Sequence, residues 1–293
     1  MAMASAVRAL LILVVGLAVA FALYRHGPIA QDVAYHHFAD TRALVLSRSL
    51  ALGRIPNALN VLTNLPFALV GLLGLGFLRR GPSRDPDGPY RPGAHTAFES
   101  LRERPAYVLF FVGVFLTTFG SGYYHLAPTT TRLFWDRLPM AVAFSAIVAA
   151  VIAERVSVYG SRMALLPLVF TGIASVVWWR ITELQGHGDL RVYLFVQLFP
   201  VLAIPLMLAL FPARYSRGIE LLFVVLVYVG AKATEHFDVA IWELTRHVVS
   251  GHSVKHVLAA LATWLVVDML KKRGRATPPI DDVIAAQADD DAA

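Results

Sequence analysis

The sequence predicts an all-α integral membrane protein, a seven-transmembrane-helix bundle with one extra helix at its N-terminus. Of the 293 residues, 57% are hydrophobic and only 16% are charged, whereas soluble domains average about 45–50% and about 25%. The apolar residues form long blocks, and eight of these approach the roughly 20 residues that cross about 30 Å of hydrocarbon. Soluble enzymes and nucleic-acid-binding proteins are excluded, because the basic residues behind the net charge of +6 lie between apolar blocks and form no single patch.

Each apolar block is predicted to be a helix, because a chain inside lipid must satisfy its backbone hydrogen bonds within the segment. The blocks cover residues 5–24, 56–78, 105–126, 134–153, 163–182, 191–211, 218–239 and 252–270. The last block has an uncharged run, residues 257–267, that covers only about 16 Å at 1.5 Å per residue. To cross the bilayer, this helix must also include His252 and His256, so both histidines are expected inside the membrane.

Three regions follow from this pattern. Residues 1–31 are expected to form a transmembrane helix or a signal peptide, because a single Arg, a long apolar run and the small residues 18–20 fit both. Residues 32–271 form the seven-helix membrane domain, in which the Pro-, Gly- and Arg-rich stretch 79–104 is expected to be a flexible loop. Residues 272–293 end in acidic residues and are expected to be a disordered cytoplasmic tail.

The distribution of Lys and Arg predicts the orientation of the helices. One side of the predicted topology carries 15 of these residues and the other carries 9. The richer side is expected to be cytoplasmic. Both termini would then be cytoplasmic if the first helix is retained, in a membrane such as the bacterial inner membrane.

Five polar residues are expected at one depth, near the non-cytoplasmic leaflet. Ser121 and His125 share a face at the end of the third helix, Asp136 lies near the start of the fourth, and His252 and His256 share a face of the last. The sequence has no cysteine, so His, Asp and Glu must supply any metal ligands. Three imidazoles beside a carboxylate indicate a catalytic zinc site, which has three protein ligands and an open position. The alternatives are interhelical hydrogen bonds and, for Asp136, a favourable place near a helix N-terminus.

A second polar group lies in the seventh predicted helix. Lys232, Glu235 and Asp238 share one face at three-residue spacing, and Glu243 follows close behind. Ionisable residues inside a membrane indicate either a mutually paired network or a functional pathway. We interpret the group as a buried network, with a proton relay in a transporter as the alternative.

The polar motifs together resemble the CREST superfamily of seven-helix membrane hydrolases, and within it the alkaline ceramidases. The similar segments are residues 120–125 with 136–140, the His252-x-x-x-His256 pair, Asn60 with residues 63–66, and Asp238 with Glu243. The resemblance covers about residues 55–271, so the first helix is an addition to the family pattern.

The resemblance implies a function and a role for each residue of the main site. His125, His252 and His256 would bind zinc. Asp136 would act as the general base toward the attacking water, and Ser121 would help to hold the oxyanion of the tetrahedral intermediate. The substrate would be a ceramide or another N-acyl lipid drawn from the bilayer, cleaved to a sphingoid base and a fatty acid. No nucleic acid is implied, and no protein partner is predicted.

The family also carries a calcium-binding segment before its first helix, where this chain keeps few acidic residues. Asp40 and Asn57 are the candidate calcium ligands, although calcium normally takes six to eight oxygens. A surface turn and a helix cap are the alternative roles. A receptor-like or haemolysin-like member of the superfamily, with the metal site but another ligand, remains the alternative function.

Overall fold

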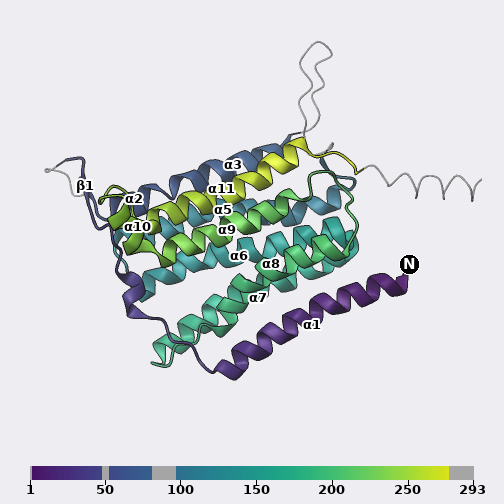
Figure 1. Cartoon of the computed structure of the whole chain (residues 1–293), viewed down its shortest axis with the longest axis horizontal. Helices are drawn as coiled ribbons and strands as arrows, with labels where there is room; N and C mark the ends of the chain where they lie inside the picture. The colour runs from purple at the N-terminus through teal and green to yellow at the C-terminus, as the bar shows by residue number, and fades with distance from the viewer. Residues whose placement is uncertain (1, 48–52, 81–96, 277–293) are drawn as a thin grey trace, which may run out of the picture.

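The computed structural model describes residues 2–47, 53–80 and 97–276 and confirms an all-α membrane bundle (Figure 1). In chain order its elements are α1 (Ala2–His26), the 3₁₀ helix η1 (Val33–His36), β1 (Leu44–Val45), β2 (Arg54–Ile55), α2 (Ala58–Leu62), α3 (Leu65–Arg79), the 3₁₀ helix η2 (Leu101–Glu103), α5 (Arg104–Leu126), α6 (Thr130–Arg155), α7 (Val158–Leu184), α8 (Arg191–Leu210), α9 (Glu220–His236), α10 (Asp238–Leu244) and α11 (Gly251–Lys272). The strands β1 and β2 form a small antiparallel pair.

Seven helical stretches among the described residues are long and apolar enough to cross a membrane, and α2 with α3 counts as one of them. The predicted helix at 218–239 is the exception. It corresponds to α9, which has only 17 residues and ends at His236. The chain turns at Phe237 and restarts as α10, because the Asp238 carboxylate accepts the backbone N–H groups of Ala39 and His252 and is held away from the axis of α9.

The helix α1 lies at the margin of the bundle, beside α8 (Figure 1). Most of its surface is exposed. At its closest approach, a Cβ at Gly16 would lie 3.1 Å from the ring of Phe199, so the small residue lets the two helices touch. This placement agrees with the prediction of an extra helix outside the main bundle.

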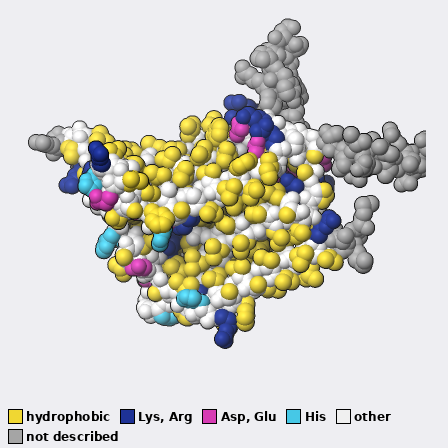
Figure 2. Space-filling model, viewed as in Figure 1, with side chains coloured by type: hydrophobic (Ala, Val, Ile, Leu, Met, Phe, Trp, Pro, Cys, Tyr) yellow, Lys and Arg dark blue, Asp and Glu magenta, His cyan; other side chains and the backbone are white. Residues whose placement is uncertain are grey.

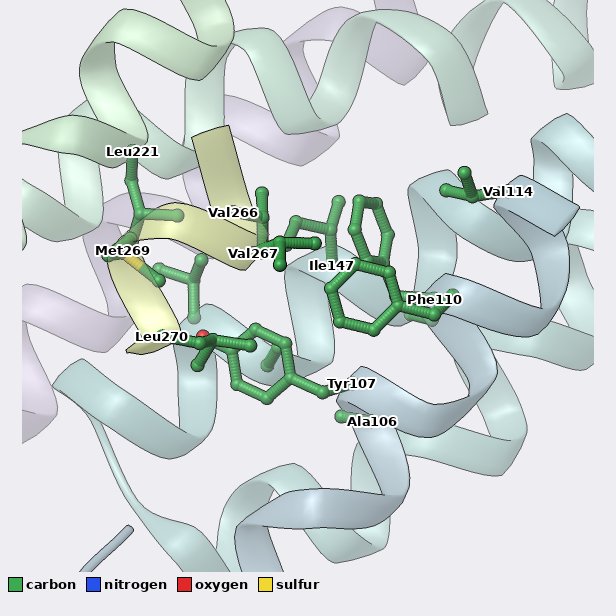
Figure 3. Packing of buried hydrophobic residues seen from close by; sticks show 14 of the residues in the cluster. Ala106, Tyr107, Phe110, Val114, Ile147, Leu221, Val266, Val267, Met269 and Leu270 are labelled. Carbon is green, nitrogen blue, oxygen red and sulfur yellow. The ribbon is translucent and has the colours of Figure 1, made fainter. Parts of the chain in front are cut away.

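The core of the bundle lies between α5, α6, α9 and α11. Figure 3 shows Tyr107 and Phe110 of α5 facing Ile147 of α6 and Val267 of α11. The outer surface is also hydrophobic, and Figure 2 shows apolar side chains over most of one face with charges gathered toward its ends and edges. An apolar core inside an apolar exterior is the arrangement expected of a protein that has lipid as its solvent.

At the end of the bundle away from the candidate site, a buried ion pair joins α6 to the segment after α11. The Arg273 guanidinium pairs with Glu154, which also accepts a hydrogen bond from the Tyr107 hydroxyl. Arg273 is only 6% exposed. The packed part of the chain therefore extends past the predicted boundary at residue 271, while most of the predicted loop at 79–104 and of the predicted tail lies outside the described residues.

Candidate metal centre

Three histidines from two helices meet at one end of the bundle. His125 comes from the last turn of α5, and His252 and His256 come from the first turns of α11. Their ring centroids lie 4.8–5.0 Å apart, and one nitrogen from each ring lies within 4.8 Å of the others. All three side chains are buried, with exposures of 1%, 4% and 4%. The convergence that the sequence predicts is present, and the cluster can hold a metal ion.

The start of α11 is fixed by hydrogen bonds from two sides. The Ser250 hydroxyl caps the helix by accepting the backbone N–H of Ser253 at 3.2 Å. The Asp238 carboxylate accepts the backbone N–H of His252 at 2.7 Å. The Ser253 hydroxyl in turn donates to the Asn60 side chain of α2 at 2.8 Å. These contacts set the direction in which His252 and His256 project from the first turns of the helix.

A glycine allows α5 and α6 to approach each other beside the histidines. A Cβ at Gly120 would lie 2.1 Å from the backbone carbonyl oxygen of Trp135, a distance that no side chain tolerates. The close crossing brings Ser121 of α5 next to Asp136 of α6, where the serine hydroxyl interacts with the carboxylate. Both residues are buried. The cluster that can hold a metal consists of the three histidines, and Asp136 lies outside it.

The hydrogen bonds of His256 identify which of its nitrogens is free. The Thr63 hydroxyl donates its single proton to the Leu59 carbonyl at 2.6 Å. It must therefore accept at its 2.9 Å contact with His256, so the proton of that imidazole is on Nδ1. The lone pair of Nε2 is left for a metal, and orientation of a ligating imidazole by a neighbouring acceptor is the usual arrangement at such sites.

The other two histidines complete a test of whether a metal fits. The Nδ1 atom of His125 is buried and has no hydrogen-bond partner among the described residues. The Nε2 atom of His252 lies 2.8 Å from the Lys255 ammonium group. A metal ligated through Nε2 would replace that contact, and Lys255 would keep its 2.8 Å ion pair with Glu235. Each histidine thus has one nitrogen that can face a metal: Nδ1 of His125, Nε2 of His252 and Nε2 of His256. These atoms together fit a three-histidine metal site.

A loop from the N-terminal part of the chain covers the histidine cluster. The ring of Phe38 lies 4.8 Å from that of His125 and 4.6 Å from that of His252. In the preceding 3₁₀ helix η1, His36 contacts the Tyr124 hydroxyl at 2.8 Å. Burial lowers the pKa of His36, and the positive charge of Arg137 acts in the same direction. The loop therefore covers the cluster with the ring of Phe38, while His36 joins the loop to α5 through Tyr124.

The predicted calcium residues have other partners. The carboxylate of Asp40 makes a two-point ion pair with Arg42, at 2.9 and 2.8 Å. Burial opposes ionisation of Asp40, but the hydrogen bonds from Arg42 outweigh it and lower the pKa of the carboxyl group. The Asn57 amide donates to the carbonyl of His125 at 2.8 Å and so supports the end of α5. Both residues thus have contacts within the protein, and calcium ligation by Asp40 and Asn57 stays a prediction.

Only part of the predicted polar group in the seventh helix forms one network. Lys232 and Glu235 pair with each other, and Glu235 also binds Lys255 and the Tyr35 hydroxyl. Asp238 instead supports α11, as described above. The Glu243 side chain is 65% exposed and pairs with His247. The turn at Phe237 separates these two acids from the face that carries Lys232 and Glu235.

Several residues of the site were not predicted by the sequence. Lys255 is placed in the last helix by the length argument, but its spacing indicates no partner. Tyr35 and Phe38 precede the bundle and reach the site only through tertiary packing. Thr63 lies in a motif of the resemblance, and its contact with His256 becomes visible only in the folded chain.

An apolar cavity of about 400 Å³ reaches the site and borders His256 of the histidine cluster. Ser121, Asp136 and His256 form part of its wall, together with Glu235 and Lys255. The wall continues between α5, α6, α8 and α9 with apolar residues, which include Phe110, Val114, Phe144, Ile147, Ile204 and Val225. A volume of this size is typical of small-molecule sites, which are mostly apolar with a few converging polar groups.

Comparisons with known proteins return no match: no family model, no curated protein and no solved structure is similar to this chain.

Proposed function

We propose that this protein is a zinc-dependent membrane amidohydrolase that cleaves the N-acyl amide bond of ceramide-like lipids. The observation that carries the proposal is the buried histidine cluster beside Ser121 and Asp136 at an apolar cavity. The resemblance of the same residues to alkaline ceramidase motifs supports it. When bound, zinc lowers the pKa of water to about 7 and polarises a carbonyl group, which is the chemistry that amide hydrolysis needs.

The protein residues divide the remaining work. His125, His252 and His256 would hold the metal. Asp136 would take a proton from the attacking water and pass it to the leaving amine, a role worth typically 10²–10⁴-fold in rate. The Ser121 hydroxyl, which is buried, would stabilise the oxyanion of the tetrahedral intermediate, since an oriented dipole counts for more there than in water.

The shape of the cavity supports a lipid substrate. Beyond Asp136 and Arg137, the cavity-lining residues of α6 are Met140, Ala143, Phe144 and Ile147, which follow at helical spacing into the bundle. An acyl chain placed along this wall would bring its amide to the level of Ser121 and Asp136.

The test measures bound metal and fatty-acid release on the purified full-length protein with a panel of ceramides. We expect about one zinc per chain in the wild type, loss of zinc in His252→Ala, and retained zinc with 10²–10⁴-fold slower hydrolysis in Asp136→Asn. Glu243→Gln is the matched control, because the Glu243 carboxylate is exposed and its ion pair among the described residues is with His247.

Two results would overturn the proposal. If the wild-type protein binds no zinc, the proposed metal site is wrong, and the receptor-like alternative, which also needs the metal, is excluded with it. Zinc-loaded protein that cleaves no N-acyl lipid would favour the receptor-like alternative over the hydrolase.

A further inference from the structure

Arg137 is a buried cation that forms no ion pair with any of the described residues. Arg137 is only 7% exposed. Nη2 donates to the Gln31 side-chain oxygen at 2.6 Å, while Nη1 is buried and has no hydrogen-bond partner among the described residues. No carboxylate of the described residues lies within ion-pair distance of it, although the neighbouring Asp136 interacts electrostatically with both Arg137 and Ser121. A buried charge is costly unless it is paired and hydrogen-bonded.

Aromatic rings hold the Arg137 guanidinium in place. Its central carbon lies 4.3 Å from the ring centroid of Trp179, 4.9 Å from that of Tyr193 and 5.8 Å from that of Tyr35. Cation–π contacts of this kind attract the guanidinium to the rings. They do not neutralise its charge, and they leave the N–H groups of Nη1 for another acceptor.

The guanidinium borders the same cavity as the candidate metal centre. Arg137, Gln31, Tyr35 and Tyr193 all line the cavity that contains Asp136. Arg137 follows Asp136 directly, whereas the apolar lining of α6 begins at Met140 and continues away from the end where the histidines lie. A lipid with its acyl chain on the apolar wall would therefore present its polar head at the level of Arg137.

Arginine in such a setting is suited to a planar anion. The guanidinium presents N–H groups in a fixed fork that matches a carboxylate, and charge-assisted hydrogen bonds of this kind are about twice as strong as neutral ones. In this cavity the other two cations, Lys232 and Lys255, are already paired with Glu235. Arg137 is the cavity-lining cation of the described residues that forms no ion pair.

We propose that Arg137 binds a carboxylate on the amine portion of the substrate, so that the preferred lipids are N-acyl amino acids. This inference rests on the proposed amidohydrolase function for its catalytic part. Water adds to the amide carbon and the C–N bond breaks. The acyl group leaves as a fatty acid, and the amine leaves as an amino acid that takes its proton through Asp136. Arg137 takes no part in the bond changes and acts as a binding residue.

The test measures equilibrium binding to metal-free, full-length protein in detergent, so that no turnover occurs. The probes are N-lauroylglycine and N-lauroylglycinamide, which differ only in the carboxylate, and laurate, which has a carboxylate but no amide. We expect N-lauroylglycine to bind at least 10-fold more tightly than its amide. Arg137→Gln should abolish that preference without weakening N-lauroylglycinamide, and Arg137→Lys should restore part of it.

Arg132→Gln is the matched control. Arg132 lies on the same helix and also contacts an aromatic ring, Tyr123 at 4.3 Å, but it does not line the cavity. Its variant should keep the full preference. Thermal unfolding of each variant establishes that it is folded. If Arg137→Gln does not fold, Arg137→Lys still tests the inference.

Equal binding of N-lauroylglycine and its amide, or a preference that survives in Arg137→Gln, would overturn the inference. Laurate binding as tightly as N-lauroylglycine, with the same dependence on Arg137, would also overturn it, because the carboxylate would then belong to the acyl side. The proposed function fails separately: a protein that prefers the anion but hydrolyses no N-acyl lipid keeps the anion site and loses the hydrolase assignment.

Discussion

Thr63 shows how one hydroxyl group can prepare a metal ligand. It stands at the short break between α2 and α3, where Pro66 lacks the N–H that a continuous helix would use. The break turns the Thr63 hydroxyl toward His256, and its other hydrogen bond, to Leu59, determines that it accepts from the imidazole. The protonation of a histidine at this site is thus set by a residue almost two hundred positions earlier in the chain.

Replacing Thr63 by Val should weaken zinc binding about 10–100-fold, the usual cost of losing a group that orients a metal ligand. A chelator competition titration measures the affinity. The control is Thr171→Val in α7, where the hydroxyl makes the same type of bond to the carbonyl four residues before it but is exposed. Zinc affinity unchanged in Thr63→Val would contradict the assigned tautomer.

Asp189 should make stability depend on pH. Hydrogen bonds from Arg191 outweigh burial and lower the pKa of Asp189 to about 2, against about 3.9 in an unfolded chain. Because the folded-state pKa is the lower one, the stabilisation is complete above about pH 4 and is lost as the pH falls toward 2.

Thermal unfolding in detergent between pH 6 and pH 3 tests this. The Tm of Asp189→Asn should lie below that of the wild type at pH 6, and the gap should narrow as the pH falls. Glu243→Gln, an exposed site, should follow the wild-type curve throughout. If the Tm difference between Asp189→Asn and the wild type stays constant across this pH range, the ionisation of Asp189 does not contribute to stability.

At the level of elements, the crossing of α5 and α6 decides whether the site exists. Gly120 permits the crossing because it has no Cβ, whereas the Cβ of any other residue would clash with the Trp135 carbonyl. The same crossing places Ser121 against Asp136. It also leaves His125, at the end of α5, beside the histidines of the first turns of α11. Spacing along each helix determines which residues share a face, but the close approach of the two backbones brings those faces together.

Gly120→Ala should lower the Tm and weaken zinc binding, because one of the two helices must move to relieve the clash. Gly122→Ala is a control within the same helix, since a Cβ there meets nothing within 4 Å. That variant should keep or raise the Tm, because alanine favours a helix over glycine by about 1 kcal/mol. A Gly120→Ala protein with wild-type Tm and zinc content would contradict the close approach.

For the whole molecule, the excess of Lys and Arg on one side predicts that the candidate site faces away from the cytoplasm. The chain has no cysteine, so one introduced cysteine is a unique label site. His187 is exposed between α7 and α8, and Arg275 is exposed beyond α11. In intact cells, an impermeant maleimide should label His187→Cys and should label Arg275→Cys only after the membrane is opened. The reverse pattern would invert the predicted orientation.

The sequence by itself determined the membrane setting, the helical class and the identity of the metal-binding candidates. These depend on local quantities: the length of each apolar block, and the four-residue spacing that puts Ser121 with His125 and His252 with His256 on one face. The transfer of a helix into lipid is dominated by its own composition, so such patterns can be interpreted without a fold.

Tertiary structure alone decided how those residues are supported and what else reaches them. The end of α9 at His236, the aromatic cover of Phe38 and the pairing of Glu235 with Lys255 depend on contacts between distant segments. The missing partner of Arg137 can be recognised only when every neighbour is in place. Side-chain pairing in a packed interior depends on distances of a few ångströms between elements, and helical periodicity does not contain that information.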